Sequence, residues 1–350
     1  MSNKPERSKT KKPSIQDVAR LAGVSQTTVS FVVNDAQDAS IPPETRERVW
    51  SAVKELNWRP NAMARGLISR RSHTIGFVSD GFVSDEMVAT PLAGKTIQGV
   101  QDEAWANDKM VLALNTGRNR KIERDAIEML LERQVDGIIY ATMFHHSVTP
   151  PAAISQVPAV LLDCYAEDRS LPSVVPDEVQ GGRAATEVLL EKGHRRVGFI
   201  NNVDPMPAQA GRLEGYRQAL EAHGVAFDPR LVQYGTTTHT SGGYRCAMEL
   251  MQLPEPPTAL FCFNDLTAMG AYDALRHLGL AIPGDVAVVG FDNLELIAAQ
   301  LSPPLSTMEL PHYQMGRWAV RYLLEHADGA REVEPVQHKI ACPFIPRSSA

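Results

Sequence analysis

The sequence predicts a small α-helical unit followed by a larger α/β unit built on open parallel sheets. Residues 14–34 have the spacing of two short helices joined at a glycine, and from residue 73 onward apolar runs alternate with amphipathic stretches. Residues 1–72 carry 13 Lys and Arg against 7 Asp and Glu, a net charge of +6, whereas residues 73–350 carry 22 against 34, a net charge of −12. This contrast indicates a phosphate-binding module joined to a body that avoids nucleic acid.

The first predicted helix follows a basic tail, residues 1–13, that we expect to be disordered. Ser14 and Asp17 have the spacing of a capping box at the start of this helix. The apolar positions that follow form one stripe, which comprises Ile15, Val18, Ala19, Leu21 and Ala22. Gly23 then supplies the permissive backbone that a tight turn requires.

A second helix is predicted after Ser25, which is placed to cap it. Its inner face comprises Val29, Val32 and Val33, and its outward residues are Gln26, Thr27, Ser30 and Phe31. A helix in this arrangement can enter the major groove of DNA, where Gln bonds the edge of adenine and Thr or Ser reaches base edges or phosphates. An ordinary amphipathic helical hairpin is the alternative that these residues alone leave open.

A third helix is predicted to begin at Pro42-Pro43, since proline in the first turn of a helix loses no hydrogen bond there. Its apolar face comprises Val49, Val53 and Leu56. Residues 14–60 are therefore expected to form one helix-turn-helix domain.

The remainder of the chain has the order of βαβ units. Buried parallel strands are expected at 74–78, 110–114, 137–140, 159–162, 197–200, 259–263 and 286–289. Amphipathic stretches between them include 96–107, 121–133, 180–192 and 211–223. Because these are more strands than one compact sheet needs, we expect two doubly wound subdomains with helices on both faces of each sheet.

From Ile15 through Arg59-Pro60-Asn61-Ala62 to Thr74-Ile75-Gly76, the chain resembles the lactose-repressor (LacI) family of bacterial transcription regulators, with further matches to about Pro311. The resemblance implies a hinge helix and linker at 61–72 and a periplasmic-binding-protein-like effector and dimerisation domain at 73–350. Its expected subdomains are 73–164 plus 309–328, and 165–308 plus 329–350. The implied crossovers between them lie near 163–165, 291–293 and 308–311.

The hinge segment is too short to be a stable helix by itself. The resemblance implies that it folds when two protomers dock on DNA, with Leu67 as an apolar wedge in the minor groove. Packing of Leu67 against the partner's hinge is a compatible second role. The candidate DNA contacts are Ser25, Gln26, Thr27, Thr28, Ser30, Phe31, Asn34, Asn61 and Leu67.

Polar residues that follow predicted strands mark the candidate effector site, because ligands of open parallel sheets bind beyond the carboxyl ends of the strands. The candidate contacts are Asp80, Asp163, Arg212, Asn264 and Asp292. Acceptors around one Arg suit a hydroxyl-rich ligand. Helix capping is an equal alternative for Asp80 and the favoured one for Asp265, whereas for Arg212, Asn264 and Asp292 the family match favours effector contact.

Three places depart from the family pattern. Phe31 stands where the recognition helix usually has a basic residue, so it either makes an apolar contact, for example to a thymine methyl, or turns inward and packs. Glu309 and Leu310 stand where a basic residue and Gln are common, and residues 85–92 lack the usual aromatic pair. These departures limit what the resemblance implies about the effector.

No pattern in the chain favours an enzyme, a cofactor or a metal site. Gly76–Gly81 does not supply a dinucleotide-binding loop, and phosphate loops, nucleophile elbows and zinc-protease motifs are lacking. His145-His146 is interpreted as part of a surface loop. Four scattered cysteines and the lack of a secretory signal or a membrane span fit a protein of the bacterial cytoplasm, associated with the nucleoid.

These features together predict a sequence-specific repressor that binds a palindromic DNA operator as a homodimer and is released by a small-molecule effector. A sugar is the favoured effector because Asp, Asn and Arg dominate the candidate site. The alternative is a corepressor-dependent regulator that responds to a nucleobase or another metabolite. A dimer is expected because no heptad pattern follows Leu324.

Overall fold

The computed structural model describes residues 13–33, 40–59, 71–81, 89–236, 239–326 and 335–350. Contacts between residues divide the chain into two units, Met1–Ser72 and His73–Ala350, which we call the head and the body. Within the described residues, no helix combines the length and the apolar character that crossing a membrane requires.

The described part of the head contains three helices around one small core. They are α1 (Ile15–Ala22), α2 (Gln26–Val33) and α3 (Pro43–Glu55). The predicted capping box is present, with the Ser14 hydroxyl accepting from the Asp17 amide and the Asp17 carboxylate accepting from the Ser14 amide. Gly23 ends α1 with a left-handed φ of 66°, which favours glycine. Val18, Val29 and Val49, one from each helix, are fully buried together.

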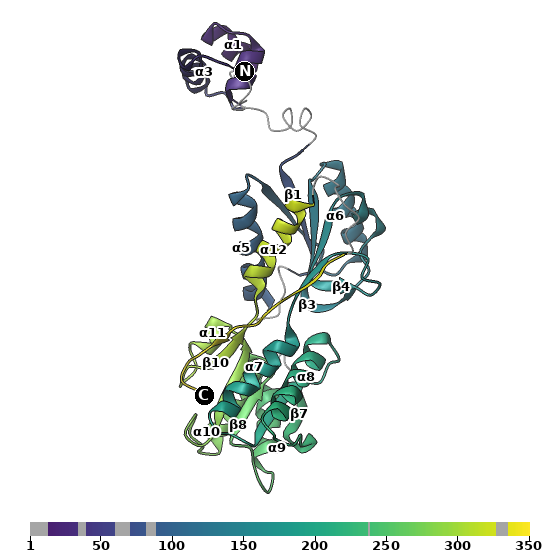
Figure 1. Cartoon of the computed structure of the whole chain (residues 1–350), viewed down its shortest axis with the longest axis vertical. Coiled ribbons are helices and arrows are strands. Elements are labelled where there is room, and N and C mark those ends of the chain that lie inside the picture. The colour runs from purple at the N-terminus through teal and green to yellow at the C-terminus, as the bar shows by residue number, and fades with distance from the viewer. Residues whose placement is uncertain (1–12, 34–39, 60–70, 82–88, 237–238, 327–334) are drawn as a thin grey trace, which may run out of the picture. The chain divides into compact units, whose positions relative to one another are not determined.

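The body contains two six-stranded sheets, and the first has the strand order β11-β5-β4-β3-β1-β2 with every pair parallel. Its strands are β1 (Thr74–Ser79), β2 (Met110–Asn115), β3 (Gly137–Val148), β4 (Ala159–Ala166), β5 (Ser173–Pro176) and β11 (Gln337–Ile340). Helices α5 (Ala89–Ala106) and α12 (His312–Glu325) cover one face and α6 (Arg120–Glu132) covers the other (Figure 1). Successive side chains of a strand point to opposite faces of the sheet. In β1, Phe77 therefore packs with α5 and α12, and its neighbour Val78 packs with α6.

The second sheet has the order β12-β10-β9-β8-β6-β7 and is parallel except for the β10–β12 pair. Its strands are β6 (Val197–Asn202), β7 (Val232–Gly235), β8 (Ala259–Cys262), β9 (Ala287–Asp292), β10 (Ser306–Glu309) and β12 (Phe344–Ile345). Its helices are α7 (Glu178–Glu191) and α8 (Pro207–Ala222) on one face, α9 (Thr240–Met251) and α10 (Asp265–His277) on the other, and the short α11 (Glu295–Ala298). Short 3₁₀ turns lie at Ala152–Gln156 and Pro229–Leu231. The two sheets confirm the predicted fold class.

The chain passes between the two sheets three times, at positions that differ in part from those expected. It crosses between β5 and α7, between β10 and α12, and between β11 and β12. The crossover expected near 308–311 is the one between β10 and α12. Those expected near 163–165 and 291–293 are wrong, because β4 continues to Ala166 and pairs with β5, and β9 pairs with β10 in the same sheet. Strands β5 and β11 therefore belong to the first sheet, contrary to the expected subdomain boundaries.

Candidate DNA-reading face and effector site

The outward face of α2 exposes the side chains that the sequence assigns to DNA contact. Ser25, Gln26, Thr27 and Phe31 are exposed, and Thr28 and Ser30 are half-buried. Val29 and Val32 hold the opposite face in the core, and the Ser25 hydroxyl caps the helix by accepting from the Thr28 amide at 3.1 Å. Phe31 is 43% exposed, so the interpretation in which it turns inward and packs is wrong. Asn34, Asn61 and Leu67 lie outside the described residues.

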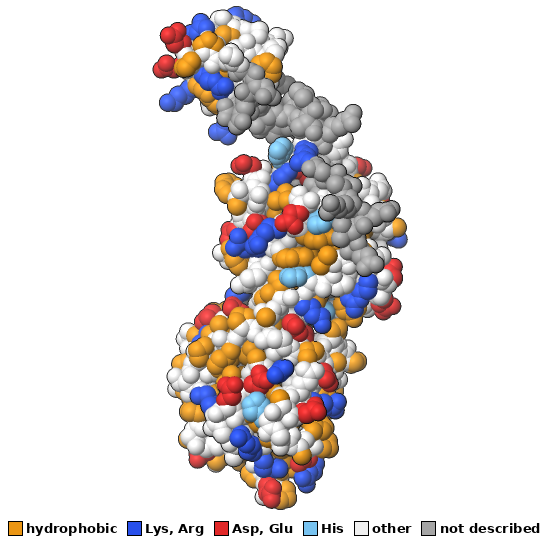
Figure 2. Space-filling view, viewed as in Figure 1, with side chains coloured by type: hydrophobic (Ala, Val, Ile, Leu, Met, Phe, Trp, Pro, Cys, Tyr) orange, Lys and Arg blue, Asp and Glu red, His pale blue; other side chains and the backbone are white. Residues whose placement is uncertain are grey.

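Basic side chains are also exposed elsewhere on the described part of the head. Arg20, Arg48, Lys54 and Arg59 are exposed, and Figure 2 shows basic side chains around the rim of this unit. Such side chains bind phosphates of any sequence, whereas the residues of α2 can read base edges. The described part of the head therefore exposes the two kinds of side chain that a DNA-binding surface uses.

In the body, Arg212 lies at the carboxyl end of the second sheet and is 3% exposed. Its Nε is 2.7 Å from Glu178 Oε2, and its Nη2 is 3.8 Å from Asp292 Oδ1. The guanidinium also lies over the rings of Phe291 and Phe263, 3.6 and 4.4 Å from their centroids. Two carboxylates and two rings therefore surround one buried cation.

Asp292 and Asn264 lie beside this cation at the ends of strands. Asp292 ends β9 in a left-handed conformation, with φ 101°, and burial raises its pKa to about 8 although Arg212 acts against the shift. Asn264 caps α10, because its side-chain oxygen accepts from the Thr267 amide at 2.8 Å. The capping role expected for Asp265 is therefore wrong.

Asp265, the first residue of α10, instead joins this helix to β10 and to the segment that follows β9. Its carboxylate accepts from the Thr307 hydroxyl at 2.6 Å and from the Leu294 amide at 2.7 Å. Burial raises its pKa to about 7, which these two hydrogen bonds oppose. Asp265 thus acts as a structural group that holds β10 and the segment after β9.

The two remaining candidates, Asp80 and Asp163, lie at the carboxyl end of the first sheet. Asp80 accepts from the Met143 amide at 2.9 Å and lies 3.5 Å from Arg118, and burial raises its pKa. Asp163 has a left-handed φ of 57° within β4, and its Oδ2 is 3.5 Å from His312 Nε2. Its carbonyl accepts from the Thr142 hydroxyl at 3.0 Å.

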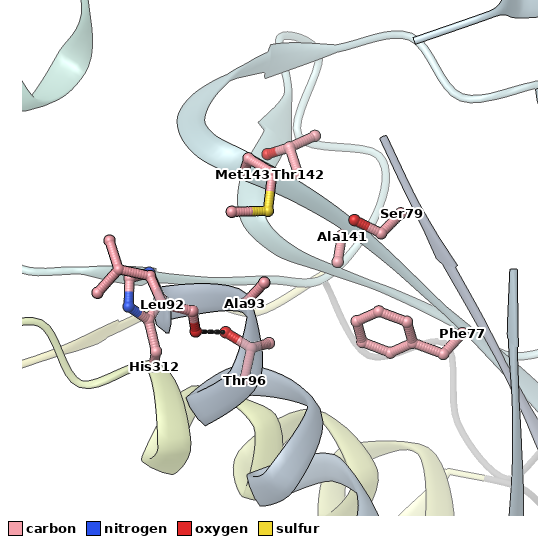
Figure 3. Close-up of a pocket in the computed structure, with 9 residues that line it drawn as sticks. All are labelled: Phe77, Ser79, Leu92, Ala93, Thr96, Ala141, Thr142, Met143 and His312. Carbon is pink, nitrogen blue, oxygen red and sulfur yellow. Dashed lines mark hydrogen bonds between the residues drawn. The ribbon is translucent and has the colours of Figure 1, made fainter. Parts of the chain in front are cut away.

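Two small hollows lie beside these residues. Figure 3 shows the first, of about 10 Å³, between the end of β1, the middle of β3 and the starts of α5 and α12, with His312 and Thr142 among its polar lining residues. This is close to the space that one water molecule needs. The second, of about 90 Å³, is bounded by Leu92 and Lys95 of α5 and by residues 293–296 after β9. It lies where α5 of the first sheet meets the second sheet.

The structure thus brings Arg212, Asn264 and Asp292 together at one sheet and places Asp80 and Asp163 at the other. The residues that sequence reasoning missed are Glu178, His145 and His312. His145 lies in β3 and is half-buried, so its assignment to a surface loop is wrong. No signal in the sequence marks Glu178, which has the form of an ordinary acid in the first turn of a helix. Among the described residues, no group of His, Cys, Asp and Glu has the arrangement of a metal site.

Comparison with known proteins finds two family models that together span the head and the body. The model of "Bacterial regulatory proteins, lacI family" matches residues 14–61, and that of "Periplasmic binding proteins and sugar binding domain of LacI family" matches residues 80–348. The repressor PurR of Vibrio atlanticus (strain LGP32) is 33% identical, over 89% of this chain and 91% of its own.

Two solved structures resemble the chain over nearly its whole length. The complex of the transcriptional regulator CelR with cellobiose is 30% identical with a TM-score of 0.64, over 97% of this chain and 100% of its own. The lac repressor dimer bound to operator and the anti-inducer ONPF is 26% identical with a TM-score of 0.73, over 97% of this chain and 99% of its own.

Proposed function

Since this chain belongs to the LacI family and is a transcriptional repressor of that family, we propose that it binds a palindromic operator as a homodimer and is released by a small-molecule effector. The effector is a sugar. The protein needs no cofactor and catalyses no reaction, and it works beside the chromosome in the bacterial cytoplasm.

The exposed polar face of α2 is the observation that carries the DNA-binding part of this proposal. Gln26 and Thr27 project from a helix that Val29 and Val32 hold in the core. Two such heads that pair about a twofold axis contact two equal half-sites of DNA. The operator of such a dimer is therefore a palindrome. The lac repressor structure, a dimer on its operator, supports the same assembly.

The group around Arg212 supports a sugar over a nucleobase. The rings of Phe263 and Phe291 lie against the guanidinium and are 6% and 0% exposed, so neither offers an open face on which a base could stack. Carboxylate, amide and guanidinium groups pair well with hydroxyls. The CelR structure, which contains cellobiose, supports the same class of ligand.

Release follows from a population shift between arrangements of the two sheets. A ligand that binds one arrangement more tightly shifts the equilibrium by its differential affinity. The crossovers carry such a change from the body toward the segment at 61–72, of which residues 61–70 lie outside the described residues. Leu67 in that segment is proposed to open a base step at the centre of the operator.

Selection from a randomised palindromic DNA library, followed by challenge of the selected duplex with sugars and nucleobases, tests this function. We expect a symmetric site to be enriched and one sugar to release the protein from it. Tighter DNA binding in the presence of a nucleobase supports the corepressor alternative instead. Failure to enrich any site contradicts the regulator proposal.

A further inference from the structure

Helix α5 covers the first sheet, but side chains of the second sheet hold the start of this helix. Leu92 is 5% exposed and lies in one core cluster with Leu294 and Leu310, which follow β9 and β10. One turn further along α5, Lys95 Nζ donates to Glu309 Oε1 at the end of β10, at 2.8 Å. An apolar contact and an ion pair therefore join the two sheets at this end of α5.

The Glu309 carboxylate is held in place by its own sheet. Asn293 Nδ2, after β9, lies 3.4 Å from Glu309 Oε1. The Asn293 side chain is held in turn by Arg347, whose Nη2 donates to Asn293 Oδ1 at 2.8 Å and to Glu295 Oε1 at 3.0 Å. Asn293 is 5% exposed, and the Arg347 side chain is 13% exposed. Lys95 therefore meets a carboxylate whose position a hydrogen-bond network has already fixed.

Glu309 stands where a basic residue is common in the LacI family, and the structure shows the consequence of this departure. In this chain a basic residue at position 309 would face Lys95 with a like charge, whereas the carboxylate attracts it. The departure thus makes an attractive contact between the two sheets where a repulsive one would otherwise lie.

A hollow of about 90 Å³ lies beside this ion pair, bounded by Leu92, Lys95 and residues 293–296. Protein interiors are normally close-packed, so a hollow gives its neighbours room to rearrange. The side chains of Lys95 and Glu309 are 33% and 25% exposed, so water can take the place of either partner. The pair can therefore open and close without a rearrangement of either core.

We propose that Lys95 and Glu309 form a latch that holds the two sheets in the arrangement described here, and that opening of this latch is part of the change by which the body alters operator binding. Both are positioning residues, because they act through the arrangement of the sheets. A pair that favours one arrangement shifts the equilibrium toward it by the free energy of the contact. The second part of this inference rests on the proposed function.

Electron spin resonance distances between two labels on the full-length protein test the latch without DNA. The labels are attached to Lys121→Cys on α6 and Glu214→Cys on α8, both at exposed positions, and the four native cysteines are buried. Lys95→Met and Glu309→Gln should each broaden the distribution of distances or add a second distance. The double variant should change it no further, because either single change already removes the pair. Distributions that coincide with that of the unchanged protein overturn the latch.

Arg317→Met is the matched control for these variants. Arg317 Nε lies 2.7 Å from Glu103 Oε2 and also joins α5 to the helix that follows β10, but both helices cover the first sheet. Loss of this pair should leave the distance distribution unchanged. If Arg317→Met altered the distances as Lys95→Met does, any loosening of α5 would be sufficient, and the specific role of the latch would be wrong.

Fluorescence anisotropy with the selected operator duplex tests the link to DNA binding. Lys95→Met and Glu309→Gln should change the operator affinity in the same direction by about threefold, the value of one half-exposed ion pair, and the double variant should change it by the same factor. Unchanged operator affinity in folded variants contradicts this link. A failed operator selection removes the proposed function, whereas a successful selection with unaltered distances and affinity removes this inference alone.

Discussion

At the scale of single residues, Phe31 gives the DNA-reading face of α2 its distinct chemistry. Its exposed ring cannot donate a hydrogen bond to guanine as a basic side chain does, but it can bury the methyl group of a thymine. The operator should therefore carry a thymine opposite Phe31 in each half-site.

Replacing single thymines of the selected operator by deoxyuridine, which lacks the methyl group, tests this contact. One position per half-site should weaken binding about fourfold, the value of one buried methyl group. Phe31→Ala should bind the thymine and uracil duplexes equally, whereas Gln26→Ala should keep the difference. If Phe31→Ala still bound the uracil duplex more weakly than the thymine duplex, another residue would make the contact with the methyl group.

Asp292 gives the body a measurable pH dependence. Its pKa is raised on folding from an ordinary value of 3.8 to about 8, so the folded state holds this proton more tightly than the unfolded state. The stabilising effect is complete below pH 4 and is lost as the pH rises toward 8. Asp292→Asn should flatten the fall in unfolding free energy between pH 5 and pH 8, as measured by urea denaturation.

The exposed carboxyl of Asp273, which pairs with Arg276 at the surface, provides the control for this measurement. Asp273→Asn should keep the slope of the unchanged protein. If the unfolding free energy of Asp292→Asn fell between pH 5 and pH 8 as steeply as that of the unchanged protein, Asp292 would not titrate in this range. Asp265, whose pKa is also raised, accounts for the slope that remains.

Sequence reasoning predicts that Asn264 and Asp292 lie near each other because residues at strand ends meet at one edge of a parallel sheet. The resemblance to the LacI family added Arg212, which lies in α8. Neither could place Glu178, which reaches Arg212 across 34 residues of sequence. His312 meets Asp163 because α12 returns to the first sheet after the whole second sheet has formed. Such contacts depend on topology, which leaves no local pattern in the chain.

At the scale of elements, α5 and α12 pack so closely that their backbones touch. A Cβ added to Gly99 would lie 2.0 Å from the Tyr313 carbonyl oxygen, and one added to Gly316 would lie 2.4 Å from that of Thr96. These contacts join the two helices that cover one face of the first sheet. Glycine is required at both positions because neither backbone can move aside cheaply.

Gly99→Ala should therefore lower the unfolding free energy of the body, by about 1–3 kcal/mol, as overpacking does. Gly94 lies on the same helix with open space around it, and Gly94→Ala should stabilise by about 0.5–1 kcal/mol. Urea denaturation of both variants measures the contrast. If Gly99→Ala and Gly94→Ala changed the unfolding free energy equally, α5 and α12 would be able to move apart without a loss of stability.

The central strands were predictable because each is a continuous apolar run. The run at 74–78 is β1 (Thr74–Ser79) and that at 137–140 begins β3 (Gly137–Val148). The run at 110–114 is also a strand, β2 (Met110–Asn115), but it lies at the edge of the first sheet and is exposed or half-buried, so the expectation that it is buried is wrong. The missed strands are short, and β11 and β12 are half-buried with mixed composition. Their pairing partners, such as Ser173 for Gln337, decide that they are strands, and those partners lie far away in the sequence.

At the scale of the whole molecule, the proposed function requires that an effector bound in the body changes DNA binding by the head. Arg212→Ala is a poor probe of this coupling, because it leaves Glu178 and Asp292 buried without their cation. We expect it to destabilise the body by about 3–5 kcal/mol. Thermal unfolding measures the loss.

The double variant Arg212→Gln/Glu178→Gln removes one charge of each sign, and the remaining Asp292 can hold its proton because burial raises its pKa to about 8. The variant should retain its unfolding temperature within a few degrees of the unchanged protein and its full operator affinity, while losing release by the effector. Fluorescence anisotropy with the selected duplex measures both properties. Loss of operator affinity in a folded double variant would mean that this pair also supports DNA binding.

The three crossovers also set the order in which a chain leaving the ribosome can be completed. The head is whole after about seventy residues, but the first sheet waits for β11 (Gln337–Ile340) and the second for β12 (Phe344–Ile345). Each sheet is therefore completed by a strand that follows all of its other strands in the sequence. A chain cut short at residue 335 would carry a finished DNA-reading surface on a body that lacks one strand from each sheet. Nonsense mutations late in the coding sequence should thus damage effector response and dimer assembly before they damage the head.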